Sequence, residues 1–238
     1  MQIYTEGESD NCVLYIHGFL ENKSMWDFVP SDDQKKIMVE IPGHGDEQLV
    51  VYKNMSDLAE MIQADLTVNN IHPKKVVGHS MGGYIAIELF KLNPKIEKLT
   101  LLNSNFWGDS ELKKQDRKRV AEIVYSQKKL FLETAIPNLF GEKALFKDEI
   151  EQLIKDAETM SPDAIAIASI AMSNRTDNTD FLKKERRQIS IIQGEIDTIV
   201  PVDQMINATN GWNEPLVVRS GHMSHIEVKD DVLRELRN

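Results

Sequence analysis

Along the chain, short apolar runs alternate with segments whose apolar residues recur at helical spacing. This alternation predicts strands that are followed by helices. Short apolar runs rich in β-branched residues recur, as in Cys12-Val13-Leu14-Tyr15-Ile16 and Ile189-Ser190-Ile191-Ile192. Such runs are typical of strands that are buried on both faces of a parallel sheet. The predicted core strands are 12–16, 36–40, 75–77, 98–102, 189–193 and 215–219.

Between several of these runs, apolar residues recur at helical spacing. In the segment 56–68, for example, Leu58, Met61, Ile62 and Leu66 fall on one face, and Ser56 with Asp57 indicates a helix start. Further helices are predicted at 81–91, 202–208 and 230–236. Strands that alternate with helices predict an α/β fold with a mostly parallel sheet of about six to seven strands.

The interval 106–182 breaks this alternation. It is rich in Lys, Glu and Gln, and helical patterns cover 111–135, 142–159 and 162–173. Several large apolar residues in it either line a cavity or form a core of their own: Phe131, Ile136, Leu139, Phe140, Phe146 and Ile170. The interval is therefore predicted to form an all-helical insertion.

The most informative stretch is Gly78-His79-Ser80-Met81-Gly82-Gly83, between a predicted strand and a predicted helix. A serine in a Gly-x-Ser-x-Gly turn at such a junction is typical of a nucleophile elbow. The small flanking residues tolerate the strained backbone and expose the hydroxyl. Ser80 is therefore the candidate nucleophile. Taken alone, the stretch is also consistent with a turn that only packs a helix on the sheet.

Two further residues follow predicted strands in the order that a Ser-Asp-His triad requires on such a sheet. Asp197 comes shortly after the strand 189–193, and His222 comes shortly after the strand 215–219. Both lie at carboxyl ends of strands, where open parallel sheets place their ligands. His222 is predicted to be the base and Asp197 the orienting acid. Taken singly, either residue also fits a structural role, and Asp203 is the fallback acid.

With these motifs the chain resembles the α/β-hydrolase superfamily over nearly its whole length. The matching segments are His17-Gly18-Phe19, Ile41-Pro42-Gly43-His44-Gly45, the elbow, the loop Gly194-Glu195-Ile196-Asp197, and Gly221-His222. Within the superfamily, the chain resembles compact serine esterases, such as pimeloyl methyl esterases, and hydrolase-fold enzymes of the menaquinone pathway. The resemblance implies a core domain of residues 1–105 and 176–238. It also implies a helical cap of residues 106–175, inserted after the sixth family strand.

The resemblance implies further details of the site. The backbone amides of Phe19 and Met81 would form the oxyanion hole. Arg175 would hold the exit of the cap, with a clamp on a substrate carboxylate as the alternative. Many relatives begin with a two-stranded hairpin, whereas only about ten residues precede the first core strand here. We therefore expect one edge strand around residues 2–5, or a truncated sheet.

The remaining histidines receive other roles. His222, His225 and Glu227 follow one another at short spacing, which also suggests a metal site. No cluster of Cys or Asp supports that hypothesis, so no metal is predicted, and His225 is expected to begin the last helix or line the pocket. His17 is expected to join loops, His79 to pack beneath the elbow, and His44 to line the mouth of the site.

Composition narrows the classes of partner. The formal net charge is −10, from 28 Lys and Arg against 38 Asp and Glu, which argues against nucleic acid as a partner.

Three features bear on the location of the protein. The single cysteine, Cys12, excludes an internal disulfide and fits a reducing compartment. Residues 1–10 lack a secretory signal pattern. No apolar run approaches the about 20 residues that span a bilayer. A cytoplasmic location without membrane attachment is expected.

Together these observations predict a serine hydrolase that cleaves a small-molecule carboxylic ester or thioester through an acyl-enzyme, without metal or organic cofactor. Three alternatives remain at this point. The first is a thioesterase or amidase on the same triad, and the second is a hydrolase-fold C–C lyase. The third is a signalling protein that binds a small ligand on the same fold. Both a monomer and a homodimer are consistent with the sequence.

Overall fold

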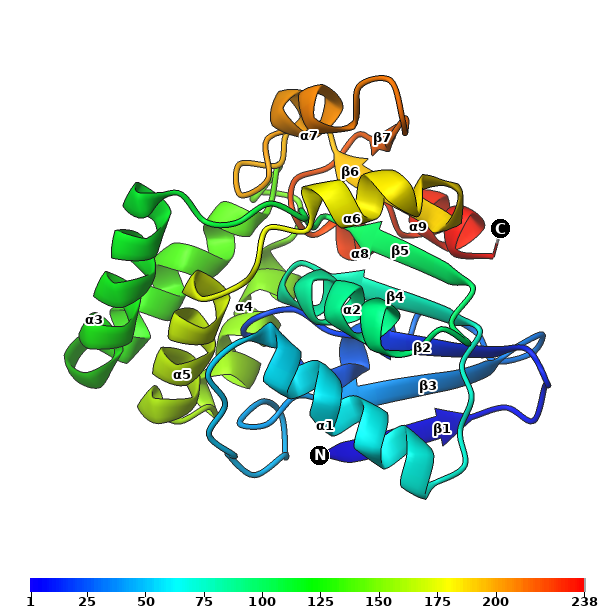
Figure 1. The fold of residues 1–238 in the computed structure, drawn as a ribbon. Coiled ribbons are helices and arrows are strands. Elements are labelled where there is room, and N and C mark those ends of the chain that lie inside the picture. Colours follow the sequence, from blue (N-terminus) through cyan, green and yellow to red (C-terminus); the bar gives the residue numbers. More distant parts are fainter. Residues whose placement is uncertain (238) are drawn as a thin grey trace.

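A seven-stranded sheet organises the chain in the computed structural model, which describes residues 1–237 (Figure 1). The spatial order of the strands is β1-β3-β2-β4-β5-β6-β7. The strands are β1 (Gln2–Glu6), β2 (Cys12–Ile16), β3 (Lys35–Glu40), β4 (Lys75–His79), β5 (Lys98–Leu102), β6 (Ile189–Gly194) and β7 (Leu216–Val218). All neighbouring pairs are parallel except β1 with β3. The predicted fold class is therefore confirmed, and the edge strand expected around residues 2–5 is β1.

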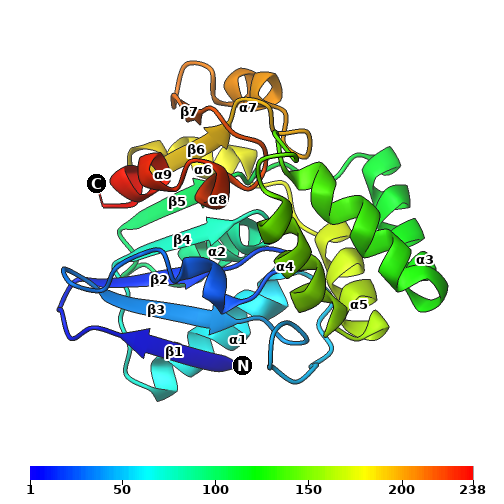
Figure 2. The ribbon, with the colours of Figure 1, turned by 180° about the vertical axis from the view of Figure 1, so that it is seen from behind.

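Helices cover both faces of the sheet. The helices outside the interval 106–182 are α1 (Met55–Val68), α2 (Met81–Leu92), α7 (Val202–Thr209), α8 (Ser224–Glu227) and α9 (Lys229–Leu236), with the 3-10 helices η1 (Lys23–Trp26) and η3 (Arg186–Gln188). Helices α1 and α2 lie in front of the sheet in Figure 1, and α8 and α9 lie in front of it in Figure 2. None of the helices in the described chain combines the length and apolar composition that crossing a membrane requires.

The sheet forms a core with each of these helix layers. On one face, the apolar stripe of α1 (Leu58, Ile62 and Leu66) packs in the same cluster as Leu14 and Ile37 of the sheet. On the other face, Val232 and Leu236 of α9 join Trp26 and Tyr15 in a second cluster. Strand β2 is buried along its whole length because both layers cover it.

The interval 106–182 is helical, as its pattern predicts. It contains α3 (Glu111–Ala135), η2 (Ile136–Leu139), α4 (Lys147–Glu158) and α5 (Pro162–Ser173), and α6 (Thr179–Lys184) begins near its end. In both ribbon views, α3, α4 and α5 gather at the side of the sheet to which the parallel strands point. These helices have a core of their own, which includes Val124, Leu132, Ile150 and Ile165.

Two details of the interval differ from the prediction, and a third was not predicted. The helix expected at 142–159 begins only at Lys147, because turns occupy residues 142–146. Helix α3 is interrupted at Gln127, whose backbone angles (φ −137°, ψ 35°) are not helical. Helix α5 serves two cores, since Ala164 and Ile165 pack among the helices while Ala171 and Met172 pack on the sheet side.

Candidate active site

Ser80 lies at the sharp turn between β4 and α2. Its backbone adopts φ 49° and ψ −116°, in the region that side-chain-bearing residues rarely occupy. The flanking glycines make this turn possible. A Cβ atom at Gly78 would lie 2.3 Å from the carbonyl oxygen of Gly82, and one at Gly82 would lie 2.2 Å from that of Ile16. The motif thus folds into a strained turn that directs the Ser80 side chain into a cavity of about 290 Å³.

The structure brings the three candidate residues of the triad together. Ser80 Oγ is 2.8 Å from His222 Nε2, and His222 Nδ1 is 2.8 Å from Asp197 Oδ2. His222 follows β7 and Asp197 follows β6, so both loops leave the same edge of the sheet as the elbow. His222 and Asp197 are 3% and 4% exposed, which shields their hydrogen bond from water.

Asp197 is held as an anion by a dense set of donors. Its Oδ2 accepts from Asn103 Nδ2 (3.1 Å) and Gln193 Nε2 (3.0 Å), and its Oδ1 accepts from the amides of Ile199 and Val200. Burial on its own raises the pKa of this carboxyl group. The charge of His222 and the hydrogen bonds outweigh burial and lower the pKa to about 2. Asp197 is therefore ionised at neutral pH.

Sequence reasoning missed Asn103 and Gln193, which are both fully buried. Gln193 Nε2 also donates to the Val200 carbonyl, and Asn103 Nδ2 also donates to the Gly221 carbonyl. A polar residue at the carboxyl end of a buried strand was the available signal, because that edge of a parallel sheet carries the ligand site. Asn103 gives a second signal, since its φ of 45° is a conformation that asparagine adopts more readily than most residues.

The backbone amides of Phe19 and Met81 lie in the segments that flank Ser80. A Cβ atom at Gly18 would lie 3.2 Å from the Ser80 Cβ, so the segment after β2 approaches the elbow closely. Met81 is the first residue of α2. Neither amide has a hydrogen-bond acceptor among residues 1–237, so both amides are free to donate to an oxygen atom of a ligand.

The other candidates occupy different places. Asp203 is exposed in the first turn of α7, and the carboxylate that pairs with His222 is that of Asp197. His17 Nε2 accepts from the Ile41 amide and so joins two loops. His44 is fully buried beside the His17 ring, and burial lowers its pKa to about 3. It does not line the cavity that contains Ser80.

His225 and Glu227 take different positions from one another. Glu227 accepts hydrogen bonds from the amides of Gly141 and Gly221, both at 3.0 Å, and so joins the loop before His222 to the segment after η2. His225 is buried and faces Glu21, with 3.5 Å between Nε2 and Oε1.

In the described part of the chain, the group of side chains with metal-ligand character is Glu21, His79 and His225, whose donor atoms lie within 4.8 Å of one another. Glu21 Oε2 and both ring nitrogens of His79 already have hydrogen-bond partners. A metal ion would have to break these contacts, so the residues as arranged do not fit a metal site.

The cavity at Ser80 has mostly apolar walls. They come from α3, η2, α5 and the loops after β2, β6 and β7, and comprise Leu20, Val120, Phe131, Ala135, Leu139, Met172, Ile199 and Met223. Two apolar residues singled out in the sequence, Phe131 and Leu139, thus line the cavity. Ile136, Phe140 and Phe146 instead contribute to the core among the helices.

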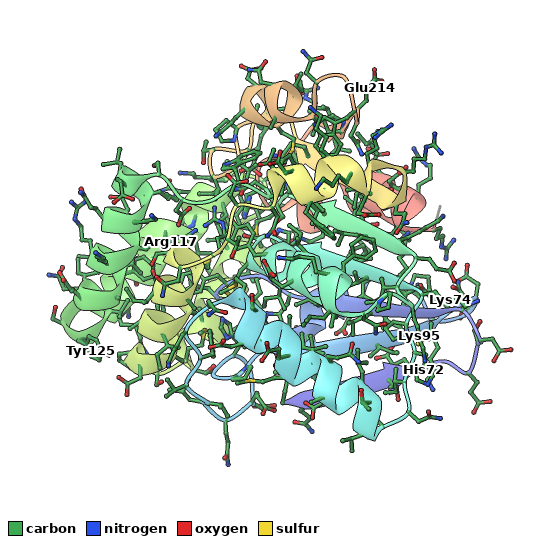
Figure 3. All side chains as sticks on the ribbon, in the orientation of Figure 1. His72, Lys74, Lys95, Arg117, Tyr125 and Glu214 are labelled. Carbon is green, nitrogen blue, oxygen red and sulfur yellow. The ribbon has the colours of Figure 1, made fainter. Side chains whose placement is uncertain are left out.

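One part of the cavity wall is cationic. Lys113 and Arg117 of α3 line it, and both also line an adjoining cavity of about 300 Å³ together with Arg175. Arg117 and Arg175 share the carboxylate of Asp109, at 3.3 and 2.6 Å. Within residues 1–237, the Lys113 ammonium group forms neither a hydrogen bond nor an ion pair. Burial lowers its pKa. Figure 3 labels Arg117 on α3, at the end of the molecule opposite Lys74 and Lys95.

Arg175 also contacts the Tyr84 ring at 4.2 Å and donates to the Trp107 carbonyl, where α5 returns to the sheet. The neighbouring Asp177 accepts from the amides of Gly108 and Thr179 instead of pairing with Arg175.

A mostly parallel sheet with a serine at a strand–helix elbow and a histidine after the last strand is the arrangement of a hydrolase fold. A profile of the alpha/beta hydrolase family matches residues 13–235, and the chain belongs to this family.

Curated relatives show limited identity. The chain is 32% identical over 89 residues to the 2-succinyl-6-hydroxy-2,4-cyclohexadiene-1-carboxylate synthase of Serratia proteamaculans, covering 36% of this chain and 35% of that protein. It is 22% identical over 241 residues to the dihydrolipoyllysine-residue acetyltransferase component of the acetoin cleaving system of Pseudomonas putida, covering 97% and 63%. The matched chain thus spans about a third to just under two thirds of these relatives.

Solved structures share the fold over nearly the whole chain. An esterase from Thermogutta terrifontis with malate bound has a TM-score of 0.90 at 24% identity, covering 99% of this chain and 91% of that one. An enol-lactonase from Burkholderia xenovorans has a TM-score of 0.85 at 17% identity, covering 99% and 94%. At these identities the likeness shows the fold alone.

Proposed function

We propose that this protein is a serine hydrolase that cleaves a carboxylic ester through an acyl-enzyme. The observation that carries the proposal is the continuous hydrogen-bonded chain from Ser80 Oγ through His222 to the ionised Asp197. A nucleophile, a base and an orienting acid require this order of atoms. Family membership supports a hydrolase and leaves the reaction open.

In the proposed reaction, Ser80 Oγ attacks the ester carbonyl carbon while His222 Nε2 takes the hydroxyl proton. The carbonyl oxygen becomes an oxyanion, to which the amides of Phe19 and Met81 donate. The C–O bond to the alcohol then breaks, and His222 returns the proton to the leaving oxygen. Water attacks the acyl-serine in the same way and releases the acid. Asp197 keeps the proton of His222 on Nδ1 and stabilises the imidazolium that forms.

Ser80→Ala tests the proposal. Hydrolysis of short p-nitrophenyl esters should fall by about 10⁴-fold or more, because the nucleophile is lost. The exposed Ser126→Ala on α3 is the matched control and should keep full activity. A Ser80→Ala protein, purified free of contaminating esterases, that retains wild-type turnover would contradict the assignment of the nucleophile.

We also propose that residues 106–175 act as a cap that selects the substrate, over a core of residues 1–105 and 176–238. Helices α3 and α5 and the 3-10 helix η2 supply much of the cavity wall. The apolar walls of the cavity favour an ester with a short apolar portion. The unpaired Lys113 in the same wall favours an acidic group on that ester. Malate, which is bound in the Thermogutta terrifontis esterase structure, shares only the acidic groups with such an ester.

Charge selection is tested with a matched pair of lysines on α3. Lys113→Met should raise KM for an ω-carboxy ester about tenfold, the effect of losing a contact worth about 1.4 kcal/mol. It should leave KM for the neutral ester of equal length unchanged. Lys118→Met removes an exposed charge from the same helix and should change neither. Equal effects on both esters would exclude charge recognition by Lys113.

A hydrolase-fold lyase is the second candidate, because the relative from Serratia proteamaculans that matches over a third of this chain is a synthase by name. Such a reaction would use His222 and Ser80 for proton transfer, without acylation of the serine. Mass spectrometry of protein quenched during ester turnover separates the two candidates. An acyl group on Ser80 supports the hydrolase, and turnover of a non-ester substrate with an unmodified serine supports the lyase.

A further inference from the structure

A second histidine–carboxylate pair, formed by Glu21 and His79, lies beside the elbow and lines part of the same cavity as Ser80. Glu21 Oε2 accepts from His79 Nδ1 at 2.7 Å and from the Gly18 amide at 2.7 Å. The other ring nitrogen, His79 Nε2, lies 3.0 Å from the backbone carbonyl oxygen of His222. Glu21 is 4% exposed and His79 is 1% exposed, so both groups are shielded from water.

The partners of His79 define its charge. A carboxylate and a backbone carbonyl only accept hydrogen bonds, so both ring nitrogens of His79 must carry a proton. Burial on its own lowers the pKa of His79, but the charge of Glu21 and the hydrogen bonds raise it above its usual range. Burial likewise raises the pKa of Glu21, and the charge of His79 outweighs this and lowers it to about 2. The pair is therefore a buried ion pair.

These contacts join the three segments that carry the proposed chemistry. Gly18 precedes Phe19, which offers an oxyanion amide. His79 precedes Ser80, and the carbonyl that faces His79 belongs to His222 itself. The packing is tight, since a Cβ atom at Gly18 would lie 2.3 Å from Glu21 Oε2 and 2.9 Å from His79 Nδ1. These contacts fix His79 relative to Glu21, which is 58 positions away in the chain, and relative to His222, which is 143 positions away.

We propose that Glu21 is a positioning residue for catalysis, which acts through protonated His79 to hold the Phe19 amide, Ser80 and the His222 backbone in register. This inference rests on the proposed ester hydrolysis. Glu21 itself does not act on the substrate. Its carboxylate accepts from the Gly18 amide and so holds the segment that carries the Phe19 amide. His79, which is bound to the same carboxylate, donates to the His222 carbonyl and so holds the base.

The other charged groups around the pair fit this role. His225, on α8, is 3.5 Å from Glu21 Oε1, and burial lowers its pKa to about 3, so it is neutral. His17 lies on the β2 side, where its Nε2 accepts from the Ile41 amide, and Asp197 lies on the β6 side and favours protonated His79 through its negative charge. Glu21 is therefore the anion that balances the proton of His79.

Glu21→Gln keeps the shape of the side chain and removes its charge. The kcat for a p-nitrophenyl ester should fall about 10- to 100-fold, the loss expected when reacting groups shift by a fraction of an ångström to one ångström. KM should change less than about threefold, because Glu21→Gln keeps the shape of a buried side chain and leaves the apolar walls of the cavity unchanged. The control is Glu149→Gln, which removes an exposed charge from α4. Glu149 lines, together with Glu21, a second cavity that does not include Ser80, and the variant should behave as wild type.

The pH profile separates positioning from general stability. In Glu21→Gln, His79 loses the anion that keeps it protonated, so kcat should decline further as pH rises through the neutral range, where wild type stays level. Glu21→Asp should recover part of the activity and the level profile, because it restores the charge. A folded Glu21→Gln protein with the same kcat and pH profile as Glu149→Gln overturns the proposal.

A measurement on the unaltered chain keeps the proposal testable if Glu21→Gln does not fold. Nitrogen-15 NMR, with His79 assigned through the backbone, should show protons on both ring nitrogens at pH 7.5, and a neutral His79 overturns the proposal. Failure of the two ideas is distinguishable. Wild type without any ester turnover refutes the proposed function and the positioning role with it. Ester turnover that depends on Ser80 but not on Glu21 refutes the positioning role alone.

Discussion

Two buried histidine–carboxylate pairs lie side by side in this molecule, His222 with Asp197 and His79 with Glu21, with 5.2 Å between the histidine ring centres. Their nitrogen–oxygen distances are nearly equal, at 2.8 and 2.7 Å. The pairs differ in what the remaining ring nitrogen faces. His222 Nε2 faces the Ser80 hydroxyl, which can give up a proton, whereas His79 Nε2 faces a carbonyl that only accepts one.

The carboxylates differ as well. Asp197 accepts from side-chain and backbone amides on both oxygens, whereas Glu21 Oε1 has no hydrogen-bond partner in the described chain. A histidine beside a buried carboxylate therefore does not by itself identify a catalytic base. The partner of its second nitrogen distinguishes a group that can take up a proton from a group that can only donate to the backbone.

The largest expected effect comes from Asp197→Asn. The asparagine would present an amide to His222 and favour the wrong tautomer, so kcat for an ester should fall by about 10⁴-fold while the fold persists. Measured beside Glu21→Gln, this loss should be at least tenfold greater. Equal losses in steady-state kinetics of the two variants would remove the distinction between the pairs.

A smaller effect is expected from Gln193→Met, which removes one donor to Asp197 at nearly constant volume. The Val200 carbonyl also loses its partner, so the free energy of unfolding should fall by about 1–3 kcal/mol. The kcat should fall roughly tenfold, because a hydrogen bond to a charged group is worth about 1.5–3 kcal/mol. Denaturant titration and kinetics on one preparation measure both. An unchanged kcat would show that the other donors suffice to hold Asp197.

The smallest expected effect is on the pH dependence of stability, and it comes from His225, the neutral histidine beside Glu21. The pKa of His225 is lowered to about 3 in the folded chain, against about 6.5 when unfolded. Between these two pH values, His225 is protonated in the unfolded chain but not in the folded chain. The stability contributed by neutral His225 is therefore present above pH 6.5 and lost as pH falls toward 3.

Denaturant titrations between pH 6.5 and 5 measure this contribution. The slope of unfolding free energy against pH should fall by about 1.4 kcal/mol per pH unit in His225→Gln relative to wild type. The exposed His72→Gln should keep the wild-type slope. A wild-type slope in His225→Gln would mean that His225 takes up a proton while the protein is folded.

Much of the fold could be predicted from local pattern. The strand at 12–16 and the helix at 162–173 appear with the predicted bounds, because continuous apolar runs and a Ser-Pro helix start are local signals. The geometry among Ser80, Asp197 and His222 is the one that the motif hypothesis requires, and their catalytic roles stay a prediction. These residues were found because each follows a strand that is recognisable from sequence.

Glu21 could not be found in this way. It lies in an irregular loop, where neither periodicity nor a motif marks a charged residue as buried, and its partner His79 is 58 positions away. The sequence suggested that His79 packs beneath the turn, but not that it is ion-paired there. Contacts between loops depend on where the sheet brings the strand ends, which local pattern does not encode.

The burial of Cys12 has a practical consequence. Its side chain is 7% exposed within β2, so a thiol-specific dye added to folded protein should react far faster with a cysteine introduced on the surface. Cysteines at the exposed positions Leu112, on α3, and Lys95, at the far end of the sheet, would then carry a fluorophore pair without prior removal of the native thiol. Energy transfer between them would reveal whether the helices above Ser80 swing relative to the sheet during turnover.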